Sequence, residues 1–226
     1  VQLVYNPSTL VTSTTWTGGT STGWINAANW SNGVPDQNSD VIIGNGTFQP
    51  SPFVNVSIKS LTLDSGSTLQ LNSGYNFTVK EAITNNGTMT LANNANLIQV
   101  NNVANTGNIT VNRNSNLLSR LDYTIWSSPT TNLALYLKTF SSATLDVRFN
   151  NYDETTNLYS SVVSPNTTPF ALGTGYLIRM PDTALDFPST QTFVGVFTGV
   201  PNNGDITKAV TRLDAAHGYN MIGNPY

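Results

Sequence analysis

The sequence predicts an all-β protein with an N-terminal β-solenoid, a β-helix-like stack of coils, followed by an antiparallel β-sandwich or jelly-roll domain. Three observations carry this prediction. The composition favours strands and turns, residues 57–112 repeat with a period near 20, and the later residues hold short apolar runs at irregular spacing.

The composition is rich in small polar residues and poor in charge. Asn, Ser and Thr fill 83 of the 226 positions, charged residues make up 9%, and Glu occurs only twice. Helices need long charged side chains on their exposed faces, so few helices are expected. Because hydrophobic residues make up 38% and aromatic residues 10%, the chain can still build a core, unlike a disordered polar chain.

Charge and cysteine content exclude several classes of protein. The net charge is −3 without a basic patch, which argues against a nucleic acid partner. No apolar run has the length of a transmembrane segment. The absence of cysteine excludes a disulfide scaffold and a thiolate metal site.

The first 45 residues contain three tryptophans in a setting rich in Gly, Thr and Asn. A solenoid needs a cover over its first coil, because an open strand edge recruits other strands. We therefore expect Trp16, Trp24 and Trp30 to cap the coil stack.

The repeat in residues 57–112 keeps its phase over three copies. Each copy alternates apolar and polar residues after an Asn-rich or Gly-containing turn, which is typical of half-buried strands joined by tight corners. The period predicts coils of about two short strands, with Asn side chains stacked at the corners. An antiparallel meander of equal hairpins is the alternative, which the constant phase disfavours. The positions that share a phase are Leu69, Met89 and Ile109; Leu71, Leu91 and Val111; and Phe77 and Leu97, with residues 60–63 assigned to the same strand series as the last pair.

The repeat with a period near 20 ends near residue 113. Short apolar runs then recur at residues 123–126, 145–149, 175–179 and 193–197, separated by prolines. Several short strands with turn signals between them are typical of a sandwich or jelly roll. The predicted domains are therefore residues 1–112, the Trp-capped solenoid, and residues 113–226, the sandwich-like domain.

Several segments resemble one bacterial protein family. Residues 28–35 leading into residues 40–43 resemble the opening of large repeat-bearing surface proteins of Bacteroidota. The segments at residues 84–88, 122–129, 173–179, 199–204 and 218–226 are similar to proteins exported by the type IX secretion system.

This resemblance implies a location more than an activity. It implies export by the type IX secretion machinery and a place in the extracellular space or on the outer cell surface. Such proteins usually end in a separate sorting domain, so we expect the full protein to continue beyond residue 226. The resemblance supplies no catalytic residues.

The chain is not expected to be an enzyme. Glycan-cleaving chemistry needs paired carboxylates at a set separation. Asp146, Asp153 and Glu154 are the candidates, and the alternative is that they are solvated or pair with Arg148. The single histidine, His217, lacks the nucleophile that a triad would need.

Calcium is the only cofactor that the sequence suggests. Asp36, Asn38 and Asp40 place oxygen ligands at alternating positions, as calcium loops do, although Val41 stands where a glycine is expected. Residues 150–154 form a second oxygen-rich segment. An ordinary turn rich in Asn and Asp is the alternative for both.

Aromatic residues among amides suggest a glycan site. The candidates Trp24, Trp30, Tyr152 and Tyr159 offer ring faces on which sugars stack, unless they are buried in the core. Thr183, in the segment Asp182-Thr183-Ala184, matches a short O-glycosylation pattern of Bacteroidota.

The sequence therefore predicts a secreted structural or adhesive surface module. Exposed coil edges predict end-to-end association with further copies, as in a filament. A carbohydrate-binding module of a glycan-degrading protein is the first alternative, with surface glycans as its partners. A polysaccharide lyase or hydrolase is the second.

Overall fold

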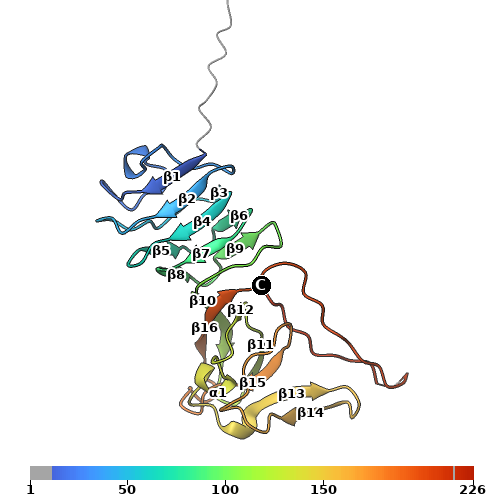
Figure 1. Ribbon diagram of the computed structural model, residues 1–226. Helices are drawn as coiled ribbons and strands as arrows, with labels where there is room; N and C mark the ends of the chain where they lie inside the picture. Colours follow the sequence, from blue (N-terminus) through green and yellow to red (C-terminus); the bar gives the residue numbers. More distant parts are fainter. Residues whose placement is uncertain (1–11, 216) are drawn as a thin grey trace, which may run out of the picture. The chain divides into compact units, whose positions relative to one another are not determined.

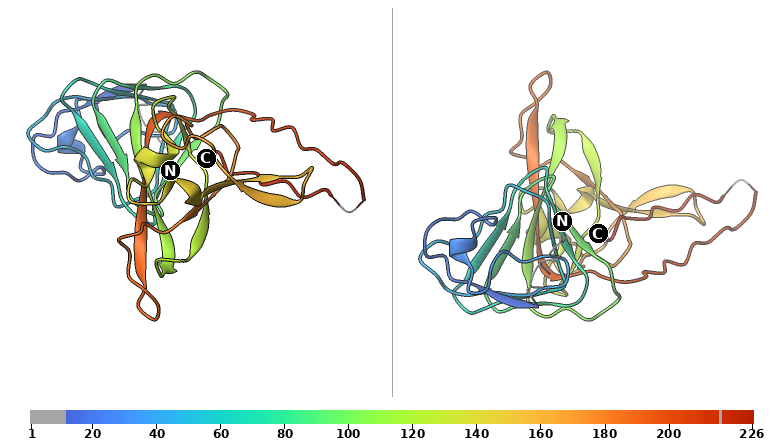
Figure 2. Two further views of the ribbon diagram at one scale, coloured as in Figure 1. Left: turned by 90° about the horizontal axis from the view of Figure 1, so that it is seen from below. Right: turned by 90° about the horizontal axis from the view of Figure 1, so that it is seen from above.

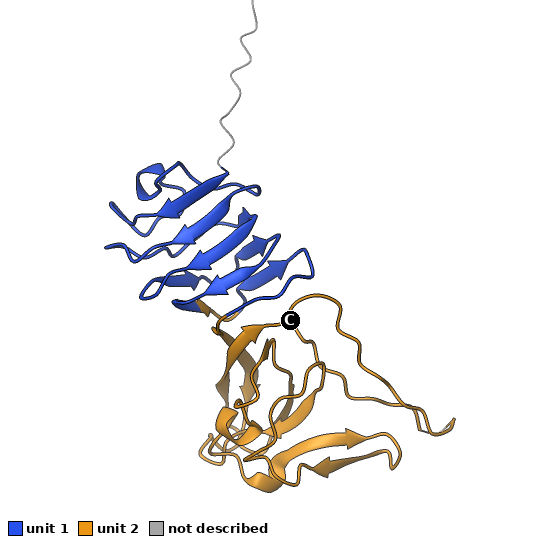
Figure 3. Cartoon of the chain, viewed as in Figure 1, with its two compact units in different colours: residues 1–89, 94–106 blue, residues 90–93, 107–226 orange. Residues whose placement is uncertain are grey.

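The computed structural model describes residues 12–215 and 217–226, and its secondary structure is almost entirely β. Strands account for 37% of the residues and helices for 5%. The chain divides into two compact units, which Figure 3 colours separately. Unit 1 comprises residues 1–89 and 94–106, and unit 2 comprises residues 90–93 and 107–226. The prediction of a solenoid followed by antiparallel sheets is confirmed.

Unit 1 is a solenoid of about four turns whose parallel strands form separate faces (Figure 1). Each full coil contributes a strand to each of three faces, so the prediction of two strands per coil was wrong. One face has the order β1-β2-β4-β7, another has the order β3-β6-β9, and on the third β5 lies beside β8. The strands are β1 (Ser13–Trp16), β2 (Asp40–Ile43), β3 (Val56–Ile58), β4 (Ser60–Leu63), β5 (Thr68–Leu71), β6 (Asn76–Val79), β7 (Ile83–Asn85), β8 (Thr88–Leu91) and β9 (Asn96–Gln99).

The strand registers confirm the predicted phase of the repeat on two faces. Phe77 lies opposite Leu97, and Leu91 lies opposite Val111. On the β1-β2-β4-β7 face the spacing changes to 22, where Leu61 pairs with Ile83. Residues 60–63 therefore belong to a different face from Phe77, which corrects their assignment to one strand series.

Alternation along each strand sends apolar side chains into the coil interior. The pattern holds because successive strand residues point to opposite sides of the sheet. Stacked amides join the coils at the surface, as the Asn-rich corners predicted: Asn96 donates from Nδ2 to Asn76 Oδ1 at 2.8 Å, and the Asn76 backbone N–H donates to Asn55 Oδ1. Among the buried interior residues are Ile43, Ile58, Leu61, Leu63, Leu69, Leu71, Phe77, Val79, Ile83, Met89 and Leu91.

The three tryptophans of residues 1–45 form one buried cluster in unit 1. The ring centroids of Trp24 and Trp30 are 4.8 Å apart, those of Trp16 and Trp30 are 5.0 Å apart, and Trp24 also contacts Phe77 edge-on. The Trp16 and Trp30 indole N–H groups donate to backbone carbonyls at 2.7 Å. The cluster is close-packed and hydrogen-bonded, as a structural role requires.

Asn29 holds the loop that carries this cluster. It ends the short 3₁₀ helix η1 (Ala27–Asn29) and is fully buried. Its Oδ1 accepts from the Thr20 N–H, the Thr20 hydroxyl and the Ser21 N–H, and its Nδ2 donates to Ser21 Oγ and the Gly23 carbonyl. A buried amide is stable here because all its polar atoms have partners.

Unit 2 consists of antiparallel sheets. The long strands β10 and β16 pair, β12 joins the other edge of β16, and a second sheet has the order β11-β15-β13-β14. β10 begins with the last copy of the repeat but pairs along its length with β16, so residues 107–112, which the sequence had assigned to the solenoid, belong to unit 2. The elements are β10 (Ile109–Leu118), β11 (Tyr123–Trp126), β12 (Thr130–Thr131), α1 (Leu137–Phe140), η2 (Asp146–Arg148), β13 (Phe149–Asp153), β14 (Leu158–Ser161), β15 (Tyr176–Arg179) and β16 (Gln191–Pro201).

Aromatic rings fill the interior of unit 2. Phe140 lies at the centre of the cluster, with its ring centroid 4.9 Å from that of Phe197 and 5.2 Å from that of Trp126. Phe170 and Phe193 complete the cluster through edge-on contacts. Rings arranged in this way bury large apolar areas and rigidify the sheets that carry them.

After β16 the chain forms an extended arm, residues 204–222, that runs out and returns without strand pairing over most of its described length. Figure 2 shows the arm in red, projecting in the same direction as the β13–β14 hairpin. Asn220 closes the arm on itself by bonding both backbone polar groups of Thr211, and Ile222 bridges to Thr174. No helix in the described residues is long and apolar enough to cross a membrane.

Candidate functional site

A polar cavity lies in unit 2 between the end of β13, the segment before β15 and the arm. Its volume is about 260 Å³, the scale of a small ligand group rather than of a large cofactor. Polar side chains outnumber apolar ones in its wall. The lining residues are Asn151, Tyr152, Asp153, Glu154, Thr174, Gly175, Lys208, Ala209, Thr211, Asn220, Met221 and Ile222.

The β13–β14 hairpin supplies one wall of the cavity. Tyr152 pairs with Tyr159 across the hairpin, and Asp153 pairs with Leu158. The turn is fixed by Asn157, which adopts a positive φ of 56°, and by Asp153, whose carboxylate accepts from the Thr155 hydroxyl and N–H. These bonds from Thr155 lower the pKa of Asp153.

Glu154 is the most enclosed charged residue of the cavity, with 5% of its surface exposed. Its Oε1 accepts a hydrogen bond of 2.6 Å from the Leu213 N–H, which ties the arm to the hairpin. Its Oε2 is shielded from solvent and has no hydrogen-bond donor among the described residues. A shielded carboxylate oxygen without a donor costs free energy, so a donor group that displaced the covering atoms would be bound favourably here.

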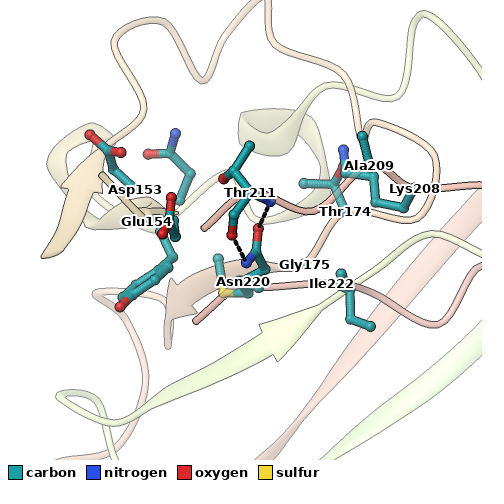
Figure 4. A pocket seen from close by; sticks show the side chains of 12 residues that line it. Asp153, Glu154, Thr174, Gly175, Lys208, Ala209, Thr211, Asn220 and Ile222 are labelled. Atoms are coloured by element: carbon teal, nitrogen blue, oxygen red, sulfur yellow. Dashed lines mark hydrogen bonds between the residues drawn. The ribbon is translucent and has the colours of Figure 1, made fainter. Parts of the chain in front are cut away.

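Lys208 stands on the other side of the cavity. Figure 4 shows Glu154 and Lys208 apart, with Thr211 and Asn220 between them. The Lys208 ammonium donates to Thr174 Oγ1 at 2.8 Å, and within the described part of the chain no carboxylate lies within ion-pair distance of it. The cavity therefore has an acidic end and a basic end.

Two tyrosines form an aromatic surface on the hairpin. The ring centroids of Tyr152 and Tyr159 are 5.3 Å apart, edge to face, and Tyr159 is 54% exposed. Partial desolvation raises the pKa of Tyr152, and the neighbouring Tyr159 and Glu154 add to the rise. The structure thus keeps these two candidates at the surface and places Tyr152 in the cavity wall.

Two of the three carboxylates considered for catalysis, Asp146 and Asp153, accept hydrogen bonds from neighbouring side chains, whereas Glu154 keeps one oxygen without a donor among the described residues. Asp146 accepts from Lys138 at 2.8 Å and from Asn166 at 2.9 Å, so its partner is Lys138 and not Arg148 as the sequence suggested. The lysine bond is the main cause that lowers the pKa of Asp146. His217 is hydrogen-bonded through Nδ1 to Asp214 at 2.7 Å.

The oxygens of the predicted calcium loop bond to the protein. Asp36 Oδ1 caps the turn by accepting from the Asn38 N–H, which is the ordinary turn geometry. Asp40 accepts from the Lys59 ammonium at 2.9 Å and the Ser60 hydroxyl at 2.6 Å. In the described chain no three His, Asp or Glu side chains gather as a metal site would require. Calcium at this loop stays a prediction.

Two of the glycan candidates are buried. Trp24 is 4% exposed and Trp30 is 6% exposed, because both belong to the tryptophan cluster of unit 1. Neither tryptophan presents a ring face to a sugar, so the prediction that they belong to a glycan site was wrong. Thr183 is exposed in a turn closed by the Ala184 N–H and the Pro181 carbonyl, so its glycosylation stays a prediction.

Sequence reasoning missed most of the cavity. The sequence suggested Glu154 as a catalytic carboxylate and as part of the oxygen-rich segment 150–154, which also contains Asn151, but it gave no role to Lys208 or Asn220. The arm has no apolar period that would place it against the hairpin. The one available signal is the position of Glu154, a rare residue type in this chain, close to Tyr152.

Comparison with known proteins identifies a family for the chain. The model of a family described as a domain of unknown function, DUF8693, matches residues 15–226. The chain belongs to this family. Searches of curated proteins and of solved structures found no match. The polar cavity of unit 2 is the feature of this DUF8693 protein that offers a ligand a place to bind.

Proposed function

We propose that this protein is a non-enzymatic adhesive module of the outer cell surface, in which the solenoid is a scaffold and unit 2 binds surface glycans. The observation that carries the proposal is the Tyr152–Tyr159 pair, in which Tyr159 is exposed and the half-buried Tyr152 lies in the wall of a polar cavity. Sugars bind proteins by stacking C–H faces on aromatic rings while amides and carboxylates bind their hydroxyls. The resemblance to type IX cargo supports export by that machinery.

In this function Asp146 and Asp153 have structural and not catalytic roles. Asp146 and Asp153 accept hydrogen bonds from Lys138 and Thr155, as a positioned structural carboxylate does. Tyr152, by contrast, shares the cavity wall with polar side chains such as Asn151, and the exposed Tyr159 contacts its ring. End-to-end association of copies stays a prediction, which electron micrographs of the purified chain test.

A glycan microarray tests the proposed function. The wild-type chain should bind a defined subset of glycans, and Tyr159→Ala should weaken that binding by about 1 kcal/mol, or roughly fivefold, because a stacking face is lost. Phe53→Ala is the matched control, since Phe53 is an exposed aromatic residue of unit 1 at 65% exposure. Binding that Phe53→Ala abolishes and Tyr159→Ala leaves intact would place the glycan site on the solenoid instead.

A further inference from the structure

The cavity of unit 2 has opposite charges at its two ends, and this polarity limits what it can hold. Glu154 is a buried carboxylate with one oxygen lacking a donor among the described residues. Lys208 is an ammonium whose hydrogen bond goes to the neutral Thr174 hydroxyl. A ligand that fills the cavity must therefore offer donors at the Glu154 end and a negative or acceptor group at the Lys208 end.

We propose that this cavity selects a uronate-type sugar residue, with its carboxylate on Lys208 and its hydroxyls on Glu154. The inference rests on the proposed glycan-binding function and names the class of glycan. A volume of about 260 Å³ suits one sugar ring. The ring carboxylate supplies the counter-charge for Lys208, and a sugar hydroxyl that displaces the groups covering Glu154 Oε2 supplies the donor that this shielded oxygen lacks.

Glu154 also fixes the orientation of the ligand. A carboxylate placed beside Glu154 would meet like charge, which costs several-fold in affinity, so the acidic group of the sugar turns toward Lys208. Asn151 stands on the same hairpin strand as Tyr152, and its Oδ1 accepts from the Ser160 hydroxyl, which leaves the amide N–H₂ as the group that a ligand acceptor can use. The Tyr152 ring forms the part of the cavity wall next to Asn151.

The arm makes this site from two distant parts of the sequence. Lys208 and Glu154 are brought to one cavity because the Leu213 N–H bonds to Glu154 Oε1. Asn220 stabilises the same stretch through its two bonds to Thr211. The chemistry of the site therefore depends on a segment outside both sheets.

Binding to polygalacturonate and to the same polymer with its carboxyl groups reduced to alcohols tests this inference. We expect the chain to prefer the acidic polymer by about fivefold or more, and added salt to narrow the difference, because the contact is ionic. Lys208→Met should abolish the preference while Lys208→Arg retains it. Lys80→Met is the control, since Lys80 is a lysine of the solenoid whose ammonium also bonds to a neutral oxygen.

A second variant tests the contact between the sugar and Glu154. Glu154→Gln keeps an acceptor for the Leu213 N–H and removes the charge, so both polymers should bind about tenfold more weakly. Equal binding of the two polymers, lost in Tyr159→Ala and unchanged in Lys208→Met, overturns the uronate inference and leaves the proposed function standing. Absence of binding to every glycan tested overturns both. Equal binding of polyglutamate and polygalacturonate also overturns the uronate inference, because charge alone would then suffice.

Discussion

Gly195 is the residue of unit 2 where the aromatic core leaves no room for a side chain. A Cβ at this position would lie 2.8 Å from Phe140 Cζ and 2.8 Å from Trp126 Cζ3. Both rings belong to a packed cluster and cannot move without disturbing its other members.

Gly195→Ala should therefore lower the free energy of unfolding by about 1–3 kcal/mol. Denaturant unfolding followed by tryptophan fluorescence measures this change. Gly218→Ala is the control, because the nearest described atoms to its Cβ would be those of the flexible Arg212 side chain, at 3.5 Å or more. Equal stability of the two variants would show that the cluster accommodates a methyl group.

Residue type alone could not separate the buried tryptophans from the exposed tyrosines. Trp24 and Tyr159 both stand among Asn and small residues in the sequence. The difference arises from tertiary structure, since Trp24 packs against Trp16 and Phe77 while Tyr159 lies on a hairpin strand exposed along its length. The aromatic candidates for a glycan site could thus be proposed from the sequence, but only the fold shows which of them are exposed.

At the scale of elements, Asp40 links two strands of the β1-β2-β4-β7 face. Hydrogen bonds from Ser60 and then Lys59 lower the pKa of Asp40 below its ordinary value. A carboxyl whose folded pKa is lowered stabilises the fold above its ordinary pKa of about 4, and that contribution is lost as the pH falls through the folded value.

Unit 1 should therefore lose stability as the pH drops below about 4, and Asp40→Asn should flatten this dependence. Urea midpoints measured from pH 7 to pH 3 test the effect, with Asp36→Asn as the matched control. Because the side chains of Asp40 and Lys59 are both well exposed to solvent, the contribution at neutral pH is small. Identical pH profiles for wild type and Asp40→Asn would contradict this account.

The solenoid could be predicted because its apolar residues recur at a nearly constant spacing along the sequence. Phe77 and Leu97 share one phase of the repeat in the sequence and lie opposite each other in the sheet. The β1-β2-β4-β7 face escaped prediction because Leu61 and Ile83 are 22 apart, so one constant period cannot align every face. Turns of unequal length absorb the extra residues without moving the buried positions.

At the scale of the whole chain, the functional proposal rests on one unit. Glu154 and Lys208 are 54 positions apart in the sequence, and only the docking of the arm brings them to one cavity. A contact of this kind depends on a single buried carboxylate and has no periodic signal in the sequence. The fold class was therefore predictable where the ligand cavity was not.

Hydrogen exchange with and without a bound glycan tests the central claim, that unit 2 carries the binding site, most directly. With the polysaccharide that binds best on the array, peptides covering residues 149–161 and 206–222 should exchange more slowly, because a ligand in the cavity holds the hairpin and arm together. Peptides covering residues 56–99 of the solenoid should keep their rates. Protection confined to the solenoid at saturating glycan would contradict the account.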